Sequence, residues 1–325
     1  MTLADILEFD DKAVSRAVEV LARGGLVAIP TETVYGLAAD AAHGEGVAGI
    51  FAAKGRPQFN PLIAHVDSIA MAERYVTFDP ISRKLAESFW PGPLTLVLPL
   101  KAQQDAPRPI HPLVTAGLAT LAIRMPTGRV RDVIKNLDSP VAAPSANTSG
   151  RISPTSAKAV ADDLGGKIDL ILDAGPCGVG VESTIVKVES DEVHLLRPGG
   201  LAAEDIEALL GVELIRAEHN AVIQAPGMME SHYAPDAAMR LDVKSVKPGE
   251  ALLAFGPTRV AGSDDAIQIL NLSESGDLRE AASNLFDFMR KLDATGAVTI
   301  TVEPIPFDGL GEAINDRLKR AAAPR

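Results

Sequence analysis

The stretch Gly24-Gly-Leu-Val-Ala-Ile-Pro-Thr-Glu-Thr-Val-Tyr-Gly36 joins a helix end, a buried strand and a polar turn. Upstream of it, apolar residues recur at helical spacing from Val14 to Leu21, and paired glycines are typical of a helix end. Leu26–Ile29 then has the apolar character of a buried strand. A helix that leads directly into a buried strand predicts a mixed α/β fold.

Short apolar segments separated by helical patterns continue along the chain. Further strands are expected at residues 62–66, 94–98, 121–124, 141–143, 168–172, 184–188, 193–196, 251–255, 267–270 and 298–302. Further helices are expected at residues 47–53, 80–88, 156–164, 203–210, 277–292 and 310–322. The periodicity lapses around the proline-bounded segment 224–235. The sequence therefore predicts an α/β domain over 1–215, a linker over 216–236, and a small Rossmann-like α/β domain over 237–325.

Composition limits the classes of function. The 325 residues include 31 Lys and Arg against 43 Asp and Glu, a net charge of −12 that disfavours stable, nonspecific binding of nucleic acid. The single cysteine, Cys177, cannot form an internal disulfide or a cysteine zinc site, which fits a reducing cytoplasm. No apolar run is long enough to span a membrane, and the acidic start does not match a signal peptide. We therefore expect a soluble, unprocessed cytoplasmic protein that binds any anionic ligand in a local pocket.

Three polar clusters could form such a pocket. The first is Pro30–Gly36, where an extended chain would place the hydroxyls of Thr31 and Thr33 on one face and Glu32 on the other. A polar turn with a helix cap is an equally good reading of this stretch alone.

The second cluster is Lys54-Gly-Arg-Pro-Gln-Phe-Asn-Pro61. A helix that ends at Lys54, with Gly55 in the left-handed conformation, would turn the chain so that Lys54 and Arg56 converge on a polyphosphate. Asn60 would be held extended by the proline that follows it. A solvated basic loop at a helix end is the more common outcome for such a pair.

The third cluster is Ala143–Gly150, in which Ser145 and Asn147 are two residues apart and could bind phosphate or ribose from one face. A turn that bonds only its own backbone is the alternative.

Four polar residues interrupt or border apolar strands: His65, Arg124, Ser183 and Arg197. Arg124 is suited to bind a carboxylate through two parallel hydrogen bonds. For any lone arginine, however, a structural salt bridge is the more common role.

Taken in order, these motifs resemble the long, two-domain form of the threonylcarbamoyl-AMP synthase (YrdC-like) family. The matching segments are PTETVYGL, KGRPQFNPL, WPGPLTLVL, LAIRMP, APSANTSGRISPT, GVESTIV and LRPGG between Pro30 and Gly200, with SHYAP and GLGEAINDR beyond. The resemblance implies a YrdC-like twisted mixed sheet and a nucleotidyltransferase that forms threonylcarbamoyl-AMP and pyrophosphate from L-threonine, bicarbonate and ATP. The product would supply the machinery that makes N6-threonylcarbamoyladenosine in tRNA.

The resemblance also implies site residues. Those expected to bind ATP are Lys54 and Arg56, both in a catalytic role, together with Asn60, Ser145, Asn147, Arg197 and Tyr233. Those expected to bind threonine are Thr33, His65, Arg124 and Ser183. The linker would cross the mouth of the site, where His232 and Tyr233 would close it.

The chemistry we expect needs no nucleophilic side chain. Threonine and bicarbonate or carbon dioxide would form a carbamate, whose oxygen attacks the α-phosphorus of ATP, and Mg²⁺ would arrive with ATP and not in a protein metal site. Two other functions compete with this one. An RNA-binding module of the same fold would show salt-dependent RNA affinity without ATP turnover, and a carbamoyl transferase would require carbamoyl phosphate.

Overall fold

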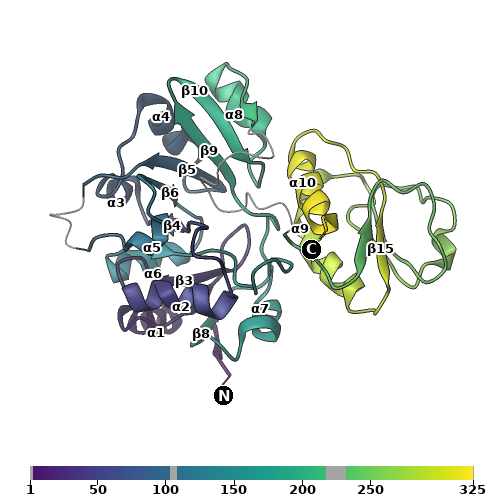
Figure 1. The fold of residues 1–325 in the computed structure, drawn as a ribbon, viewed down its shortest axis with the longest axis horizontal. Helices are drawn as coiled ribbons and strands as arrows, with labels where there is room; N and C mark the ends of the chain where they lie inside the picture. Colours follow the sequence, from purple (N-terminus) through teal and green to yellow (C-terminus); the bar gives the residue numbers. More distant parts are fainter. Residues whose placement is uncertain (1–2, 103–107, 217–231, 325) are drawn as a thin grey trace.

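Two sheets organise the chain in the computed structural model, which describes residues 3–102, 108–216 and 232–324 (Figure 1). Within these described ranges, eleven strands form the large sheet, in the order β1-β8-β2-β3-β7-β4-β6-β5-β9-β10-β11. They are β1 (Asp5–Glu8), β2 (Val27–Ile29), β3 (Gly36–Asp40), β4 (Ile63–His65), β5 (Leu94–Pro99), β6 (Thr120–Arg124), β7 (Val141–Ala142), β8 (Leu170–Asp173), β9 (Thr184–Glu189), β10 (Glu192–Arg197) and β11 (Ile215–Arg216). Parallel and antiparallel pairs both occur, so the predicted mixed sheet is confirmed.

Helices cover the large sheet. They are α1 (Asp11–Ala22), α2 (Gly44–Lys54), α3 (Ile69–Glu73), α4 (Pro80–Phe89), α5 (Pro112–Thr115), α6 (Val130–Leu137), α7 (Ala157–Leu164) and α8 (Ala203–Leu210). Most of the buried apolar side chains of helices and strands merge into one core. Among the described residues, no helix combines the length and apolarity that a membrane crossing requires.

The small sheet has four parallel strands in the order β12-β15-β13-β14. They are β12 (Ala238–Arg240), β13 (Ala251–Ala254), β14 (Ile269–Asn271) and β15 (Thr299–Val302), accompanied by the 3-10 helix η1 (Ser263–Asp265), α9 (Leu278–Asp293) and α10 (Leu310–Ala322). Most of the predicted linker, residues 217–231, lies outside the described residues.

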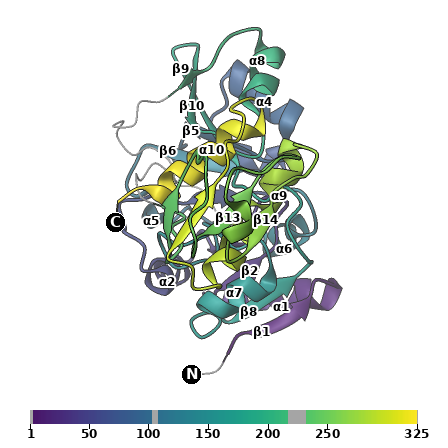
Figure 2. The ribbon, with the colours of Figure 1, turned by 90° about the vertical axis from the view of Figure 1, so that its right-hand side faces the viewer.

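Helices α9 and α10 lie between the two sheets (Figures 1 and 2). The apolar core of the small domain includes Val34, Ile152 and Val181 of the large domain, so the two domains share buried surface. This contact brings the small domain against the loops that follow β2 and precede β9.

The pairing of the strands brings polar residues together at one end of several neighbouring strands of the large sheet. His65 ends β4 and pairs with Arg124, which ends the parallel strand β6. Thr95, near the start of the antiparallel strand β5, also pairs with Arg124. Arg197 ends β10 opposite Ile185, near the start of β9. Strand ends that are far apart in the sequence therefore meet at one place.

A glycine allows the close packing at these strand ends. A Cβ at Gly199 would lie 2.4 Å from the backbone of Glu182, Ser183 and Thr184. We predict that Gly199→Ala lowers the free energy of unfolding by about 1–3 kcal/mol, since the crowding atoms are backbone atoms that cannot rotate away. Chemical denaturation would measure this loss. Gly178→Ala is the matched control, because nothing lies within 4 Å of its Cβ position. Equal stability of the two variants would contradict the close-packing argument.

Candidate functional site

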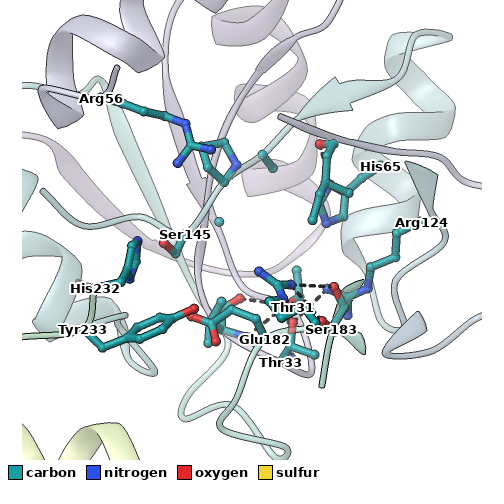
Figure 3. Close-up of a pocket in the computed structure, with 16 residues that line it drawn as sticks. Thr31, Thr33, Arg56, His65, Arg124, Ser145, Glu182, Ser183, His232 and Tyr233 are labelled. Carbon is teal, nitrogen blue, oxygen red and sulfur yellow. Dashed lines mark hydrogen bonds between the residues drawn. The ribbon is translucent and has the colours of Figure 1, made fainter. Parts of the chain in front are cut away.

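A cavity at the strand ends described above is lined by polar residues of the large domain and by His232 and Tyr233 (Figure 3). Its polar lining residues are Thr31, Thr33, Arg56, His65, Arg124, Ser145, Glu182, Ser183, Arg197, His232 and Tyr233. Arg56 and His65 point into the space from one side, and Glu182 and Tyr233 from the opposite side. Among the described residues, three guanidinium groups and one carboxylate line the cavity, so they concentrate positive charge in an acidic protein.

The turn after β2 provides the first hydroxyl groups. Thr31 and Thr33 lie on one face, with their Oγ1 atoms 2.8 Å apart, as the sequence predicts. Glu32 points elsewhere: it lines a second cavity of about 290 Å³, and its Oε1 lies 2.6 Å from Nη2 of Arg124.

Arg124 is held on three sides. Its Nε donates to the Gly92 carbonyl at 3.1 Å and its Nη1 to Thr33 Oγ1 at 2.8 Å, while Nη2 pairs with Glu32. The structural ion pair, the competing interpretation of the sequence, is therefore present. A guanidinium has five N–H donors, so these three contacts leave donors for a second carboxylate.

Helix α2 ends as predicted, at Lys54 with Gly55 at φ 60°. The turn brings Arg56 to the cavity, where its Nη2 donates to the Pro61 carbonyl at 2.8 Å and its Nε to the Asn60 carbonyl at 3.3 Å. Burial, followed by the charge of Arg197, lowers the pKa of Arg56 to about 10. Arg56 therefore remains charged near neutral pH.

Lys54 departs from the expected convergence with Arg56. Its Nζ donates to the carbonyls of Ser145 and Asn147, and it does not line the cavity. Burial and the nearby Arg56 charge hold the pKa of Lys54 well below its usual range. In this structure Lys54 fixes the loop after β7, and direct contact with ATP stays a prediction.

The same loop separates Ser145 from Asn147, which were expected to share a face. Ser145 lines the cavity. The side-chain amide of Asn147 instead donates to the carbonyls of Thr148 and Arg151 at 2.8 and 2.9 Å. This is the local-turn alternative that the sequence left open, and it gives Asn147 a role in shaping the loop.

Arg197 and Ser183 form the part of the wall next to β9. Nη2 of Arg197 donates to the Ser183 carbonyl at 2.8 Å, and Ser183 Oγ lies 2.7 Å from Thr95 Oγ1. Burial lowers the pKa of Arg197 to about 10, which leaves it charged near pH 7.

The two histidines of the wall are neutral at pH 7. Burial, followed by the charge of Arg124, lowers the pKa of His65 to about 3. Burial and Arg320 lower the pKa of His232 to about 3. His232 and Tyr233 line the cavity, where the sequence placed them.

The sequence reasoning missed Glu182, the only carboxylate among the described residues that line the cavity. Its Oε1 accepts from Ser153 Oγ at 2.6 Å and its Oε2 from Arg317 Nε at 2.8 Å. The available signal was that Glu182 is the one charged residue in the segment GVESTIV.

Comparisons with known proteins match both domains. A family model described as "Telomere recombination" matches residues 19–199, and one described as "Threonylcarbamoyl-AMP synthase, C-terminal domain" matches residues 201–323. The chain is 40% identical to a threonylcarbamoyl-AMP synthase of Bacillus subtilis, over 99% of this chain and 96% of that one. The chain belongs to the threonylcarbamoyl-AMP synthase family.

Solved structures agree with this family assignment. The crystal structure of Pyrococcus abyssi Sua5 complexed with L-threonine matches with a TM-score of 0.86 and 37% identity, covering 99% of this chain and 97% of that one. Escherichia coli YciO shares the fold of the large domain, with a TM-score of 0.53 and 18% identity over 61% of this chain and 96% of that one. The fold and family expected from the sequence are therefore confirmed, while the roles of individual residues stay predictions.

Acid should weaken the Glu182 contact with the small domain. Burial alone would raise the pKa of Glu182, but Arg317 and Arg197 outweigh it and lower the pKa to about 2. Against an unfolded value of about 4.3, the ionised group contributes about 3 kcal/mol of stability above roughly pH 4.3, which is lost as the pH falls toward 2.

We predict that Glu182→Gln is less stable than the wild type at about pH 7, and that the difference shrinks at about pH 3. Urea unfolding at both pH values would measure it. Glu213→Gln, an exposed change, is the control. A difference that is independent of pH would contradict the assigned pKa.

Proposed function

We propose that this cavity is the active site in which this member of the family joins L-threonine, bicarbonate and ATP into threonylcarbamoyl-AMP and pyrophosphate. The observation that carries the proposal is how its arginines are held. The described hydrogen bonds of Arg56 go to neutral carbonyl groups, whereas Arg124 is paired with the carboxylate of Glu32. The cavity therefore has a strongly positive side and a nearly neutral side.

The positive side suits the nucleotide. ATP carries several negative charges, and cations that stay charged in a buried cavity bind phosphate oxygens strongly. We assign Arg56 and Arg197 to the phosphate groups, with Ser145, Asn60 and Tyr233 at the nucleotide. Lys54 and Asn147 hold the loop that carries Ser145, and their direct contact with ATP remains part of this proposal.

The nearly neutral side suits threonine, whose amine and carboxylate charges cancel before reaction. We assign the carboxylate to the remaining donors of Arg124, next to Thr33 and Ser183. His65, which is neutral at pH 7, adds no charge that would repel the amine. Glu32 orients the guanidinium from behind.

In the reaction we propose, the protein acts mainly by positioning the reactants. The threonine ammonium group loses a proton to solvent, and its nitrogen forms a carbamate with bicarbonate, which loses water, or with carbon dioxide, in which case a second proton is lost. A carbamate oxygen then attacks the α-phosphorus, and pyrophosphate leaves. Holding the reactants together and neutralising phosphate charge lower the barrier without a covalent intermediate on the enzyme. Buried surroundings would also protect the anhydride product from water.

Magnesium enters this proposal as the ion that ATP carries. The described residues contain no group of three or more His, Cys, Asp or Glu side chains that could hold a metal ion. Glu182, whose carboxylate is the only one that the described part of the chain contributes to the cavity wall, is bonded to Ser153 and Arg317. This arrangement fits an ion coordinated by phosphate oxygens and water, because Mg²⁺ usually keeps several waters and few protein ligands.

We further propose that the enzyme works in the cytoplasm and passes its product to the enzymes that modify tRNA. The buried free thiol of Cys177 supports a reducing compartment.

The reaction can be tested directly. Incubation with ATP, bicarbonate and isotope-labelled threonine should give a labelled adenylate that mass spectrometry identifies, together with threonine-dependent release of pyrophosphate. Carbamoyl phosphate should be unnecessary. Salt-sensitive RNA binding without any ATP turnover would overturn the proposal in favour of an RNA-binding module.

Two variants should separate the two sides of the cavity. Arg56→Ala should lower the rate roughly a hundredfold, because a preorganised phosphate contact is lost. Arg124→Ala should mainly raise the KM for threonine. Initial rates of pyrophosphate release would give the maximal rate and the KM for threonine. The control is Lys158→Ala, because the side chain of Lys158 on α7 is 83% exposed. Wild-type constants in both variants would remove this assignment of the site.

A further inference from the structure

A fully buried arginine of the small domain reaches the wall of the cavity. Arg317 on α10 is 0% exposed. Its Nε donates to Glu182 at 2.8 Å and its Nη1 to the Pro198 carbonyl at 3.0 Å, so it bonds two segments of the large domain. Its Nη1 also donates to Asp316, the preceding residue of α10, at 2.6 Å. Such a buried guanidinium is tolerated only where partners replace its hydration.

The small domain also fixes the loop that carries Glu182. Arg290 of α9 donates to the carbonyl of Ser153, whose hydroxyl in turn donates to Glu182. Gly180 has φ 81°, and a Cβ there would lie 2.3 Å from the Ala282 carbonyl of α9. The loop therefore packs directly against α9 as well as bonding to α10.

Tyr233, another residue of the cavity wall, is held by the same helices. Its ring stacks on Phe286 of α9 with the centroids 5.4 Å apart. The guanidinium carbons of Arg317 and Arg320 lie 5.3 and 5.2 Å from the ring centroid. Cations at this distance attract the aromatic ring.

The position of Glu182 creates an electrostatic problem for the proposed nucleotide side. It is a negative charge in the wall that also contains Arg56 and Arg197. A buried carboxylate without a partner would attract the nearest cation strongly, because the local dielectric is low. Arg317 supplies that partner from outside the cavity, since it is not among the residues that line it.

We propose that Arg317 is a positioning residue of the active site: by pairing with Glu182 it prevents that carboxylate from offsetting the positive charge that Arg56 presents to the phosphate groups of ATP. The small domain thereby completes the nucleotide side of a site whose substrate contacts come from the large domain and Tyr233. This inference rests on the proposed function and gives the small domain a part in it.

Substitution of Arg317 should act on ATP more than on threonine. In Arg317→Met, which keeps an unbranched side chain, we expect the KM for ATP to rise about tenfold or more and the KM for threonine to change less than about threefold. Arg317→Lys keeps the positive charge but lacks the planar guanidinium group, so its KM for ATP should lie between those of the wild type and Arg317→Met. Lys319→Ala is the control on the same helix: its ammonium lies over Phe307 and its side chain is exposed, so both constants should stay unchanged.

A double variant separates this role from simple support of the fold. Adding Glu182→Gln to Arg317→Met removes the unpaired negative charge, so the KM for ATP should return to that of Glu182→Gln alone. Additive losses in the double variant would overturn the inference. If Arg317→Met does not fold, Arg317→Gln with and without Glu182→Gln gives the same comparison, because glutamine also removes the positive charge.

Calorimetric titration with a non-hydrolysable ATP analogue and Mg²⁺ separates this inference from the proposed function. If the wild-type protein forms no threonylcarbamoyl-AMP, the proposed function fails, while weaker binding of the analogue by Arg317→Met still supports the electrostatic role. If the wild-type protein is active and Arg317→Met binds the analogue as tightly as Lys319→Ala does, the inference is wrong and the proposed function stands.

Discussion

Positive charge buried in one cavity is the constraint on which the site depends. Each guanidinium loses hydration when it is buried, and the protein replaces that hydration in two ways. Carbonyl groups hold Arg56 without cancelling its charge, whereas a carboxylate holds Arg124 and cancels most of it. This difference divides a single cavity into a side for a polyanion and a side for an amino acid, within a chain whose net charge is −12.

The two-domain architecture serves the same constraint. The large domain brings strand ends together by mixed pairing, so that His65, Thr95 and Arg124 occupy adjacent register positions. The small domain then balances the carboxylate of Glu182 in the cavity wall through Arg317. Charge balance therefore crosses the domain boundary, because the cation of this buried salt bridge belongs to the small domain and its carboxylate to the large one.

Local pattern predicted the elements that carry strong signals. The helix ending at Lys54 was predicted because a glycine follows its helical pattern. The strand near Leu94–Leu98 was predicted because it is a run of apolar residues. Strand β3 was missed, since its Gly-Leu-Ala-Ala-Asp sequence is poor in strand-forming residues and becomes a strand only between β2 and β7. Helix α6 was missed as well, although its buried residues follow helical spacing.

The composition of the site was predictable, but its partners were not. A polar residue at the end of an apolar strand indicates a side chain that can face a site, and this pattern identified Arg124 and Arg197. Whether such a side chain meets a carbonyl, a carboxylate or solvent depends on segments distant in sequence. Glu32 reaches Arg124, and Arg317 reaches Glu182, only once the sheet order and the domain contact exist. These distant partners set the charge of each side of the cavity, so the tertiary structure determines which side suits which substrate.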